Sequence, residues 1–285
     1  MYEKPLEEFV RYAEQDGVIA TARDLQIEIS GGTPEEVDQK MLSLLPIMRE
    51  SVQKGMDRSL HSISGLTGGQ APKLNDAVLA GLTAGGSLLG RAEVKALAIA
   101  EANAAMDRIV AAPTAGSCGI LPGVLLTLQE EKGLTDEQLL PGLYTAAAIG
   151  LVIATHASIS GAEGGCQAEC GSASAMAAAA AVVLLGGTPR QAVDAVGFAL
   201  MNIMGLVCDP VQGLVEVPCV YRNVSGVSNA LSAADLALSG IKCPLPPDEV
   251  VDAMKAVGDM MPPALRETGE GGCAACPSAR KCAKP

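Results

Sequence analysis

The chain has 285 residues, of which 49% are apolar. It is long enough for one large domain or two smaller ones, and rich enough in apolar residues to bury a large core. Aromatic residues make up only 2% and tryptophan is absent, so small and aliphatic side chains must build that core. The formal net charge of −12 argues against binding to nucleic acids and to anionic membranes, which attract basic proteins.

The N-terminal segment and the cysteine content indicate a cytoplasmic protein. Residues 1–8 are acidic where a secretory signal would be basic. Without such a signal, nine cysteines point to a reducing compartment, where clustered thiols serve metals or redox chemistry. The most apolar runs, residues 143–155 and 173–185, fall short of the roughly 20 residues that span a bilayer. We therefore expect buried helices and no membrane span.

The N-terminal part is predicted to be helical and amphipathic. Residues 5–15 place apolar side chains on one helical face, and residues 18–32 are interpreted as a connector. Thr33 is followed by proline and by glutamate three residues on, which is typical of a capped helix start. Apolar residues then recur at helical spacing, so residues 33–58 are expected to form a peripheral helix.

Two loops rich in hydroxyl groups and glycine interrupt the next helical patterns. The first covers residues 59–69 and the second residues 111–123, with helices expected at residues 75–89 and 92–110 between them. Backbone amides in the second loop can cradle a small anion at a helix start. That loop is not a nucleotide-binding P-loop, because no Gly-Lys-Ser/Thr sequence follows.

The second half of the chain is also predicted to be helical, over residues 135–155, 173–185, 188–205, 223–239 and 247–258. Only residues 211–217 alternate as a β-strand would, and this stretch is short. A glycine-rich tail, residues 266–285, ends the chain. The sequence thus predicts an all-α fold, a large helical domain with glycine- and proline-rich loops between helices.

Three cysteines in glycine- and proline-rich segments carry the clearest chemical signal. Thiolates from Cys166, Cys208 and Cys219 can hold an iron–sulfur cubane and leave one iron open to a substrate. Zinc is the rival metal, although its cysteine ligands are usually closer in sequence. Buried free cysteines also serve as small apolar residues, and spacing alone does not decide between these interpretations.

The other cysteines are given less weight. Cys118 and Cys170 lie in similar loops and are interpreted as packing residues. The spacing of Cys273 and Cys276, with Cys282 beyond them, is typical of metal or redox sites. A flexible tail with incidental thiols explains these three equally well.

Histidine and lysine positions narrow the possible chemistry. His61 lies beside Ser62 and Ser64 in the first loop, where it can act as a general base, bind a carboxylate or make ordinary hydrogen bonds. No lysine occurs between Lys132 and Lys242. This absence weakens the case for pyridoxal phosphate, which forms a Schiff base with a lysine.

Four motifs, in order, resemble the alpha chain of the iron–sulfur-dependent L-serine dehydratases. They are Pro113-Thr-Ala-Gly-Ser-Cys-Gly-Ile-Leu-Pro-Gly, Ser158-Ile-Ser-Gly-Ala-Glu-Gly-Gly-Cys-Gln-Ala-Glu, Cys208-Asp-Pro-Val-Gln-Gly-Leu-Val-Glu-Val-Pro-Cys and Arg266-Glu-Thr-Gly-Glu-Gly-Gly. The resemblance covers nearly the whole chain. It implies a helical catalytic domain over residues 1–285 that converts L-serine to pyruvate and ammonia. It also implies a [4Fe–4S] cluster on Cys166, Cys208 and Cys219, and no pyridoxal phosphate.

The resemblance further implies a partner. The family has a smaller beta domain with a Ser-His-Thr-Val-Gly-Pro motif, which this sequence lacks. We therefore expect a separate beta chain and a hetero-oligomer. In some single-chain relatives a cysteine at the extreme C-terminus reaches the cluster, whereas this chain ends Cys282-Ala-Lys-Pro285.

Dehydration of serine assigns roles to the loops. As the resemblance implies, an open iron would activate the hydroxyl as a Lewis acid while a base removes the α-proton. His61 is our candidate base, unless the beta chain supplies it. The candidates for binding the substrate are Ser62, Ser64, Gly68, Thr114, Gly116 and Ser117. Two alternatives remain, another [4Fe–4S] hydro-lyase acting on a small hydroxy acid and a non-enzymatic iron–sulfur protein.

Overall fold

The computed structural model describes residues 5–281, and within them it contains helices and loops but no β-strand. The all-α prediction is confirmed. Residues 211–217, the one stretch with strand-like alternation, form no strand, because Val211–Gly213 is a single 3₁₀ turn with Gln212 at a positive φ of 59°. Cys282 and the last residues of the predicted tail lie outside the described residues.

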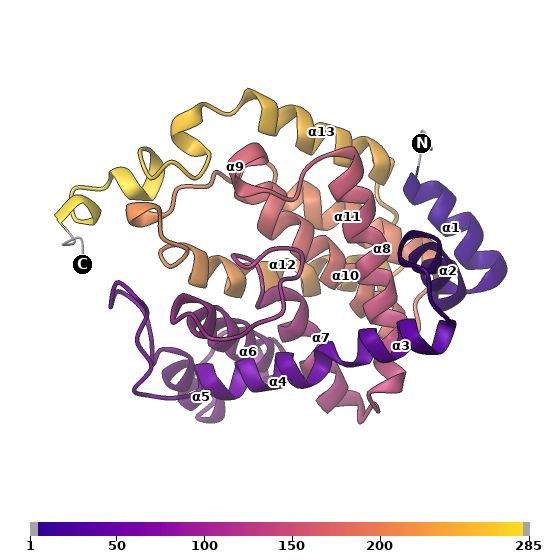
Figure 1. The fold of residues 1–285 in the computed structure, drawn as a ribbon, viewed down its shortest axis with the longest axis horizontal. Helices are drawn as coiled ribbons and strands as arrows, with labels where there is room; N and C mark the ends of the chain where they lie inside the picture. The colour runs from indigo at the N-terminus through magenta and orange to yellow at the C-terminus, as the bar shows by residue number, and fades with distance from the viewer. Residues whose placement is uncertain (1–4, 282–285) are drawn as a thin grey trace.

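Helix α10 (Ser172–Leu184) lies at the centre of the molecule, with other helices on all sides (Figure 1). It packs against α7 (Ile120–Lys132), α8 (Leu140–His156), α11 (Pro189–Asn202) and α12 (Cys219–Leu238). Every residue of α10 through Val182 is buried. Alanine projects little beyond the backbone, so neighbouring helices can approach α10 closely.

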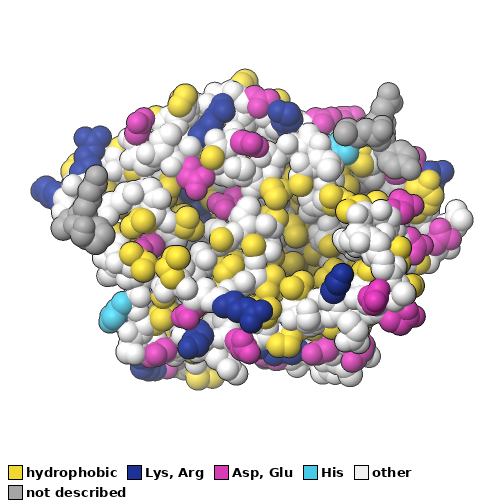
Figure 2. All heavy atoms as spheres, viewed as in Figure 1, with side chains coloured by type: hydrophobic (Ala, Val, Ile, Leu, Met, Phe, Trp, Pro, Cys, Tyr) yellow, Lys and Arg dark blue, Asp and Glu magenta, His cyan; other side chains and the backbone are white. Residues whose placement is uncertain are grey.

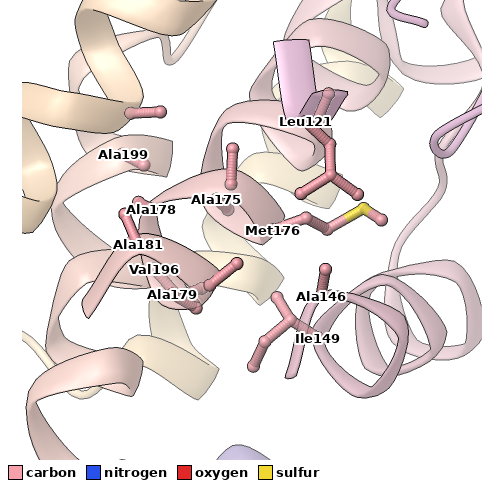
Figure 3. Packing of buried hydrophobic residues seen from close by; sticks show 14 of the residues in the cluster. Leu121, Ala146, Ile149, Ala175, Met176, Ala178, Ala179, Ala181, Val196 and Ala199 are labelled. Atoms are coloured by element: carbon pink, nitrogen blue, oxygen red, sulfur yellow. The ribbon is translucent and has the colours of Figure 1, made fainter. Parts of the chain in front are cut away.

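The close view of this core shows how α10 meets its neighbours (Figure 3). Ala178 and Ala181 lie near Val196 and Ala199 of α11, while Met176 points to the opposite side. That side is formed by Leu121, Ala146 and Ile149 from α7 and α8. Met176 is unbranched and adaptable, so it fills the wider gap that alanine leaves there.

The N-terminal region is more helical than predicted. It forms α1 (Pro5–Asp16), α2 (Val18–Ser30), α3 (Pro34–Leu42) and α4 (Leu44–Gly55). The connector expected over residues 18–32 is therefore wrong: Ala22 is buried and Ile19 packs on the core. The single helix expected over residues 33–58 is two helices that meet at Ser43.

The middle helices begin and end earlier than predicted. They are α5 (Ala71–Leu79) and α6 (Gly86–Ala104), separated by turns at Gly81 and Gly86, which have positive φ. Helix α7 begins inside the loop expected over residues 111–123. A side chain on Gly123 would come within 2.9 Å of the Ala92 carbonyl oxygen, so glycine lets α7 pack directly on α6.

In the second half, the predicted helix starts at Thr135 and Thr188 are confirmed. Each threonine exchanges hydrogen bonds with the glutamine three residues on, and α8 begins after the short 3₁₀ turn Glu137–Leu139. Helix α13 (Pro247–Met260) follows α12. Helix α12 begins earlier than predicted, so Cys219 is its first residue and does not lie in a loop.

Two stretches are long and apolar enough to span a membrane by length and composition alone, Glu137–His156 and Gln167–Leu184. We expected the apolar runs to be too short to span a bilayer. These helical stretches are longer than those runs, so length alone does not exclude a span. Within the protein, 56% of the first window and 83% of the second are buried. Core helices of a soluble protein meet the same criteria, so these stretches are weak evidence for a membrane.

Candidate active site

The three predicted cysteine ligands all come to one buried region. Cys166 lies between the short helix α9 (Gly161–Gly164) and the π-helical turn Gln167–Gly171, Cys208 follows α11, and Cys219 begins α12. Their exposures are 1%, 3% and 7%. After burial, negative charge on Cys166 is the next cause that raises the pKa of both other thiols, so all three lie within electrostatic range of one another.

Cys166 also contacts a fourth thiol. The Cys166 and Cys170 thiols share a hydrogen bond, with 3.3 Å between the sulfur atoms. This bond lowers the pKa of Cys166 despite burial, and the nearby Arg222 guanidinium lowers it further. π-Helical turns often occur at functional sites. Cys170, which we interpreted as a packing residue, therefore has a specific partner.

Cys208 and Cys219 are less acidic thiols. Burial is the main cause that raises the pKa of Cys219 to about 12 and the pKa of Cys208 as well. Both therefore carry protons at neutral pH in the metal-free protein, and a metal would have to displace them. Among residues 5–281, no three His, Cys, Asp or Glu side chains are arranged to hold a metal ion.

A half-buried carboxylate, that of Glu169, lies between the second loop and Cys208. Glu169 accepts a short hydrogen bond from the Thr114 hydroxyl, and a side chain on Gly116 would approach its Oε1 to 2.5 Å. A Cβ on Gly161 would lie 3.4 Å from Glu169 Oε2 and 2.9 Å from the Cys208 sulfur. Two glycines thus leave room for this carboxylate and the thiol to face the same space.

The environment of Glu169 makes it more basic than an ordinary glutamate. Burial raises its pKa, and the Thr114 hydrogen bond opposes this only in part. We had not identified Glu169 as a functional residue. The available signal was an acidic residue inside a glycine- and cysteine-rich motif just before a buried apolar helix.

Asn223 joins the second loop to the start of α12. It is 1% exposed, and its Oδ1 accepts a hydrogen bond of 2.8 Å from the Gly119 amide. Its Nδ2 donates to the carbonyl oxygens of Gly116 and Cys219 at 2.7 and 2.9 Å. This one side chain therefore fixes the loop that holds Glu169 relative to Cys219.

Asp209 and Arg222 form an ion pair beside Cys208. Arg222 Nη2 lies 2.7 Å from Asp209 Oδ1, with the two side chains only 13% and 3% exposed. Arg222 also donates to the Val207 carbonyl oxygen at 2.8 Å. The ion pair therefore holds the segment that carries Cys208.

The C-terminal segment packs along the backbone of Cys208. The Cys208 amide donates a hydrogen bond to the Leu265 carbonyl oxygen at 2.9 Å. The Glu267 amide donates a hydrogen bond to the Cys208 carbonyl oxygen at 2.7 Å. These bonds form an isolated parallel bridge between Cys208 and Arg266. The last of the four motifs in the sequence therefore contacts the third.

The first loop is held from both sides. The Ser64 hydroxyl and amide both bind the Glu216 carboxylate, which belongs to the segment between Cys208 and Cys219. The buried Glu101 carboxylate accepts hydrogen bonds of 3.0 Å from the amides of Gly68 and Ala71. Of the residues predicted here, Ser64 is therefore the one tied to the cysteine segment.

Ser62, Gly68 and His61 have other surroundings. The Ser62 hydroxyl oxygen accepts a hydrogen bond from the Thr67 amide at 3.2 Å, which closes a turn. Gly68 packs against the backbone at His61, where a side chain would not fit. His61 itself is exposed. Thr114, Gly116 and Ser117 do come together, since the hydroxyl oxygens of Thr114 and Ser117 are 3.1 Å apart.

Comparison with known proteins identifies clear relatives. A family model described as "Serine dehydratase alpha chain" matches residues 6–274. The chain is 52% identical to a "Probable L-serine dehydratase, alpha chain" from Bacillus subtilis over 259 residues, 91% of this chain and 86% of that protein.

Two further relatives extend the comparison. The chain is 45% identical to the "L-serine dehydratase, alpha chain" of Peptoniphilus asaccharolyticus over 256 residues, 90% of this chain and 88% of that protein. It is 34% identical to "L-serine dehydratase 1" of Escherichia coli over 286 residues, which is 95% of this chain but 61% of that protein. The Escherichia coli relative is thus longer than this chain.

Proposed function

Because the chain belongs to the serine dehydratase alpha chain family, we propose that it catalyses the β-elimination of water from L-serine to give pyruvate and ammonia. The observation that carries this proposal is the grouping of Cys166, Cys208 and Cys219 in one buried region beside the Glu169 carboxylate. Thiols beside a half-buried carboxylate provide metal ligands and a proton acceptor in one place.

The chemistry of the donor set fits a [4Fe–4S] cluster. Thiolates are the ligands that such clusters take, and each cysteine binds a different iron, so the sulfur atoms need not converge on one point. Such a spread agrees with the lack of a single-ion site among the described residues. We propose Cys166, Cys208 and Cys219 as the ligands, with Gly161 leaving clearance beside Cys208.

When bound, such a cluster with one iron free of protein ligands supplies a Lewis acid for the hydroxyl group that leaves. The chain's own residues must then position serine and accept its α-proton. Glu169 has the placement and the raised pKa for a general base, because its Oε2 faces the space beside Cys208. Thr114 orients the carboxylate through Oε1 and leaves Oε2 to the substrate.

Carboxylate binding is assigned to the second loop. Ser117 is buried next to Thr114, and the Gly116 amide also lies against Glu169. Hydroxyl and amide donors of this kind can hold the serine carboxylate. Ser62, Ser64 and Gly68 stay candidates from the first loop, since Ser64 reaches Glu216 in the cysteine segment.

A separate beta chain is proposed to cover the first loop. Ile63 and Met106 are 59% and 77% exposed, and the Ile63 amide donates to the carbonyl oxygen of Ala104 at the end of α6. Apolar side chains are exposed across the middle of the face in Figure 2 as well. Exposed apolar surface of this kind is typical of protein interfaces. A partner seated there would enclose His61, which is the alternative base if Glu169→Gln retains turnover.

The cellular setting follows from the same chemistry. The eight cysteines within the described residues are all unpaired, which suits the reducing cytoplasm that we expected. No role is assigned to pyridoxal phosphate, because the segment around the three cysteines contains no lysine.

The test is an anaerobic assay of the chain purified with its beta chain. We expect pyruvate from L-serine in the presence of both chains, and little or no fumarate from L-malate, since fumarate is the product that dehydration of this small hydroxy acid would give. Replacing Glu169 by Gln should abolish most turnover, whereas His61→Gln reports whether the first loop supplies the base. Absence of pyruvate from an iron-loaded two-chain preparation would contradict the proposal.

A further inference from the structure

Two exposed cysteines near the C-terminus have no part in the proposed function. Cys273 lies within the short 3₁₀ turn Gly272–Ala275, and Cys276 directly follows it. The Cys276 amide donates to the Cys273 carbonyl oxygen at 3.1 Å. A turn closed in this way brings the two Cα atoms within about 7 Å. Disulfides join Cα atoms about 4.4–6.8 Å apart, so the backbone already places this pair in reach.

The same turn is fastened to the buried ion pair beside Cys208. The Cys273 amide donates to Asp209 Oδ2 at 2.6 Å, while Oδ1 of the same carboxylate lies 2.7 Å from Arg222. Burial raises the pKa of Cys273, and a hydrogen bond between its thiol and Asp209 raises it further. Asp209 therefore recognises Cys273 in its thiol form.

We propose that Cys273 and Cys276 are a thiol–disulfide modification site that exchanges with low-molecular-weight disulfides. The Cys276 thiolate attacks one sulfur of such a disulfide, breaks its S–S bond and releases one thiol. Cys273 then gives up its proton and attacks the Cys276 sulfur, which releases the second thiol. One protein S–S bond replaces two S–H bonds, and the external disulfide is reduced to two thiols.

The two cysteines have distinct parts in this exchange. Cys276 attacks first, because the Cys273 amide is held 2.6 Å from Asp209 Oδ2, and burial together with this neighbouring carboxylate raises the pKa of Cys273. Closing the disulfide removes the Cys273 S–H donor from Asp209 and leaves the carboxylate with the Cys273 amide and Arg222. Oxidation of this pair therefore changes the hydrogen bonding of Asp209, the residue next to Cys208.

A metal site accounts less well for this pair. Among residues 5–281 no third His, Cys, Asp or Glu completes a metal-binding group with Cys273 and Cys276. Asp209 is already engaged by Arg222 and by the Cys273 amide. Two exposed thiols in a turn, by contrast, are accessible to small disulfides.

The experiment maps thiols in the two-chain protein after equilibration with defined mixtures of reduced and oxidised glutathione. Free thiols are blocked with N-ethylmaleimide and the peptides are analysed by mass spectrometry. We expect a Cys273–Cys276 disulfide that increases with the oxidised fraction and disappears with dithiothreitol. Buried Cys118 should remain a thiol throughout. The map does not depend on dehydratase activity, so this inference can fail independently of the proposed function.

Two variants sharpen the test. Cys276→Ser should leave Cys273 unmodified and basal activity unchanged, and Asp209→Asn should shift disulfide formation to a lower oxidised fraction, because the thiol form loses its carboxylate acceptor. The proposal is overturned if both cysteines stay thiols in mostly oxidised glutathione, or if chelatable zinc protects them. An unchanged response in a folded Asp209→Asn protein would overturn the link to Asp209.

Discussion

Glu169 is the residue on which the proposed proton transfer depends. Its carboxylate is oriented by Thr114 through a hydrogen bond and is kept basic by burial. A charge that helps catalysis costs free energy of folding when it is removed from water, so such a glutamate makes the enzyme more active and less stable. The effect on turnover and the effect on the free energy of unfolding can both be measured.

Replacing Glu169 by Gln should lower kcat on the order of 10²–10⁴-fold, the usual contribution of a general base. In the native enzyme, kcat/KM should rise with pH until the raised pKa of Glu169 is passed, and the variant should lack this limb. Glu163→Gln is the matched control, since Glu163 is exposed in the same segment. Native-like turnover of Glu169→Gln would contradict the assignment.

The same substitution should stabilise the protein at neutral pH. The folded-state pKa of Glu169 lies above its unfolded value, so the folded state favours the protonated form. Its contribution to the free energy of unfolding is present at low pH and is lost as pH rises through the folded pKa. Urea unfolding should therefore show equal stability in acid and a more stable Glu169→Gln protein near neutrality. A variant that is less stable at every pH would contradict this reasoning.

Gly161 tests whether clearance beside Cys208 matters. Alanine suits a helix better than glycine by roughly 1 kcal/mol, yet a Cβ here would lie 2.9 Å from the Cys208 sulfur. We expect Gly161→Ala to lose iron and activity while the free energy of unfolding changes little. Gly150→Ala is the control, because its Cβ meets only the flexible end of Met176. Equal iron content in both variants would argue against a cluster beside Gly161.

At the scale of elements, the site depends on how the second loop is joined to α12. Asn223 makes this connection with three buried hydrogen bonds to backbone groups. Because these bonds join Gly116 and Gly119 to Cys219, the side chain determines where the second loop lies relative to α12.

Asn223→Ala should destabilise the protein by about 3 kcal/mol, since each buried hydrogen bond contributes on the order of 1 kcal/mol. Activity of the folded fraction should fall as well. Asn229→Ala in the same helix is the control: its side chain is half-buried and bonds to Asn202 and Ala199 away from the loop. Guanidinium unfolding of both variants provides the measurement, and equal losses would show that Asn223 has no special role.

The sequence predicted where helices begin better than it predicted how far they extend. Thr33, Thr135 and Thr188 cap helices as their sequences indicate, because capping depends on side chains within one turn. Helix α2 was taken for a connector because only one side of it packs on the core. The start of α12 was placed too late, since Val217-Pro-Cys219 reads as a loop until its helical neighbours are known.

At the scale of the whole molecule, composition predicted the kind of core and not its layout. A chain with few aromatic residues must pack alanine helices closely, and α10 does so at the centre (Figure 3). The order of helices around α10 could not be predicted, because no local pattern encodes which apolar faces meet.

The sequence predicted part of the site, namely its cysteines, but not the residues around them. The motifs identified Cys166, Cys208 and Cys219, and the structure brings them into one region. Glu169, Asn223 and the ion pair of Asp209 with Arg222 were missed. Glu169 and Asn223 act through contacts with residues more than 50 positions away in the sequence, and sequence spacing does not reveal such contacts.

The most direct test of the account is the iron and sulfide content of cysteine variants purified anaerobically with the beta chain. The native protein should hold about four iron and four sulfide per alpha chain, as a [4Fe–4S] cluster requires. Cys166→Ala, Cys208→Ala and Cys219→Ala should each lose iron and pyruvate formation, while Cys118→Ala, also buried, should keep both. Full iron content and full turnover in any of the first three variants would contradict the ligand assignment.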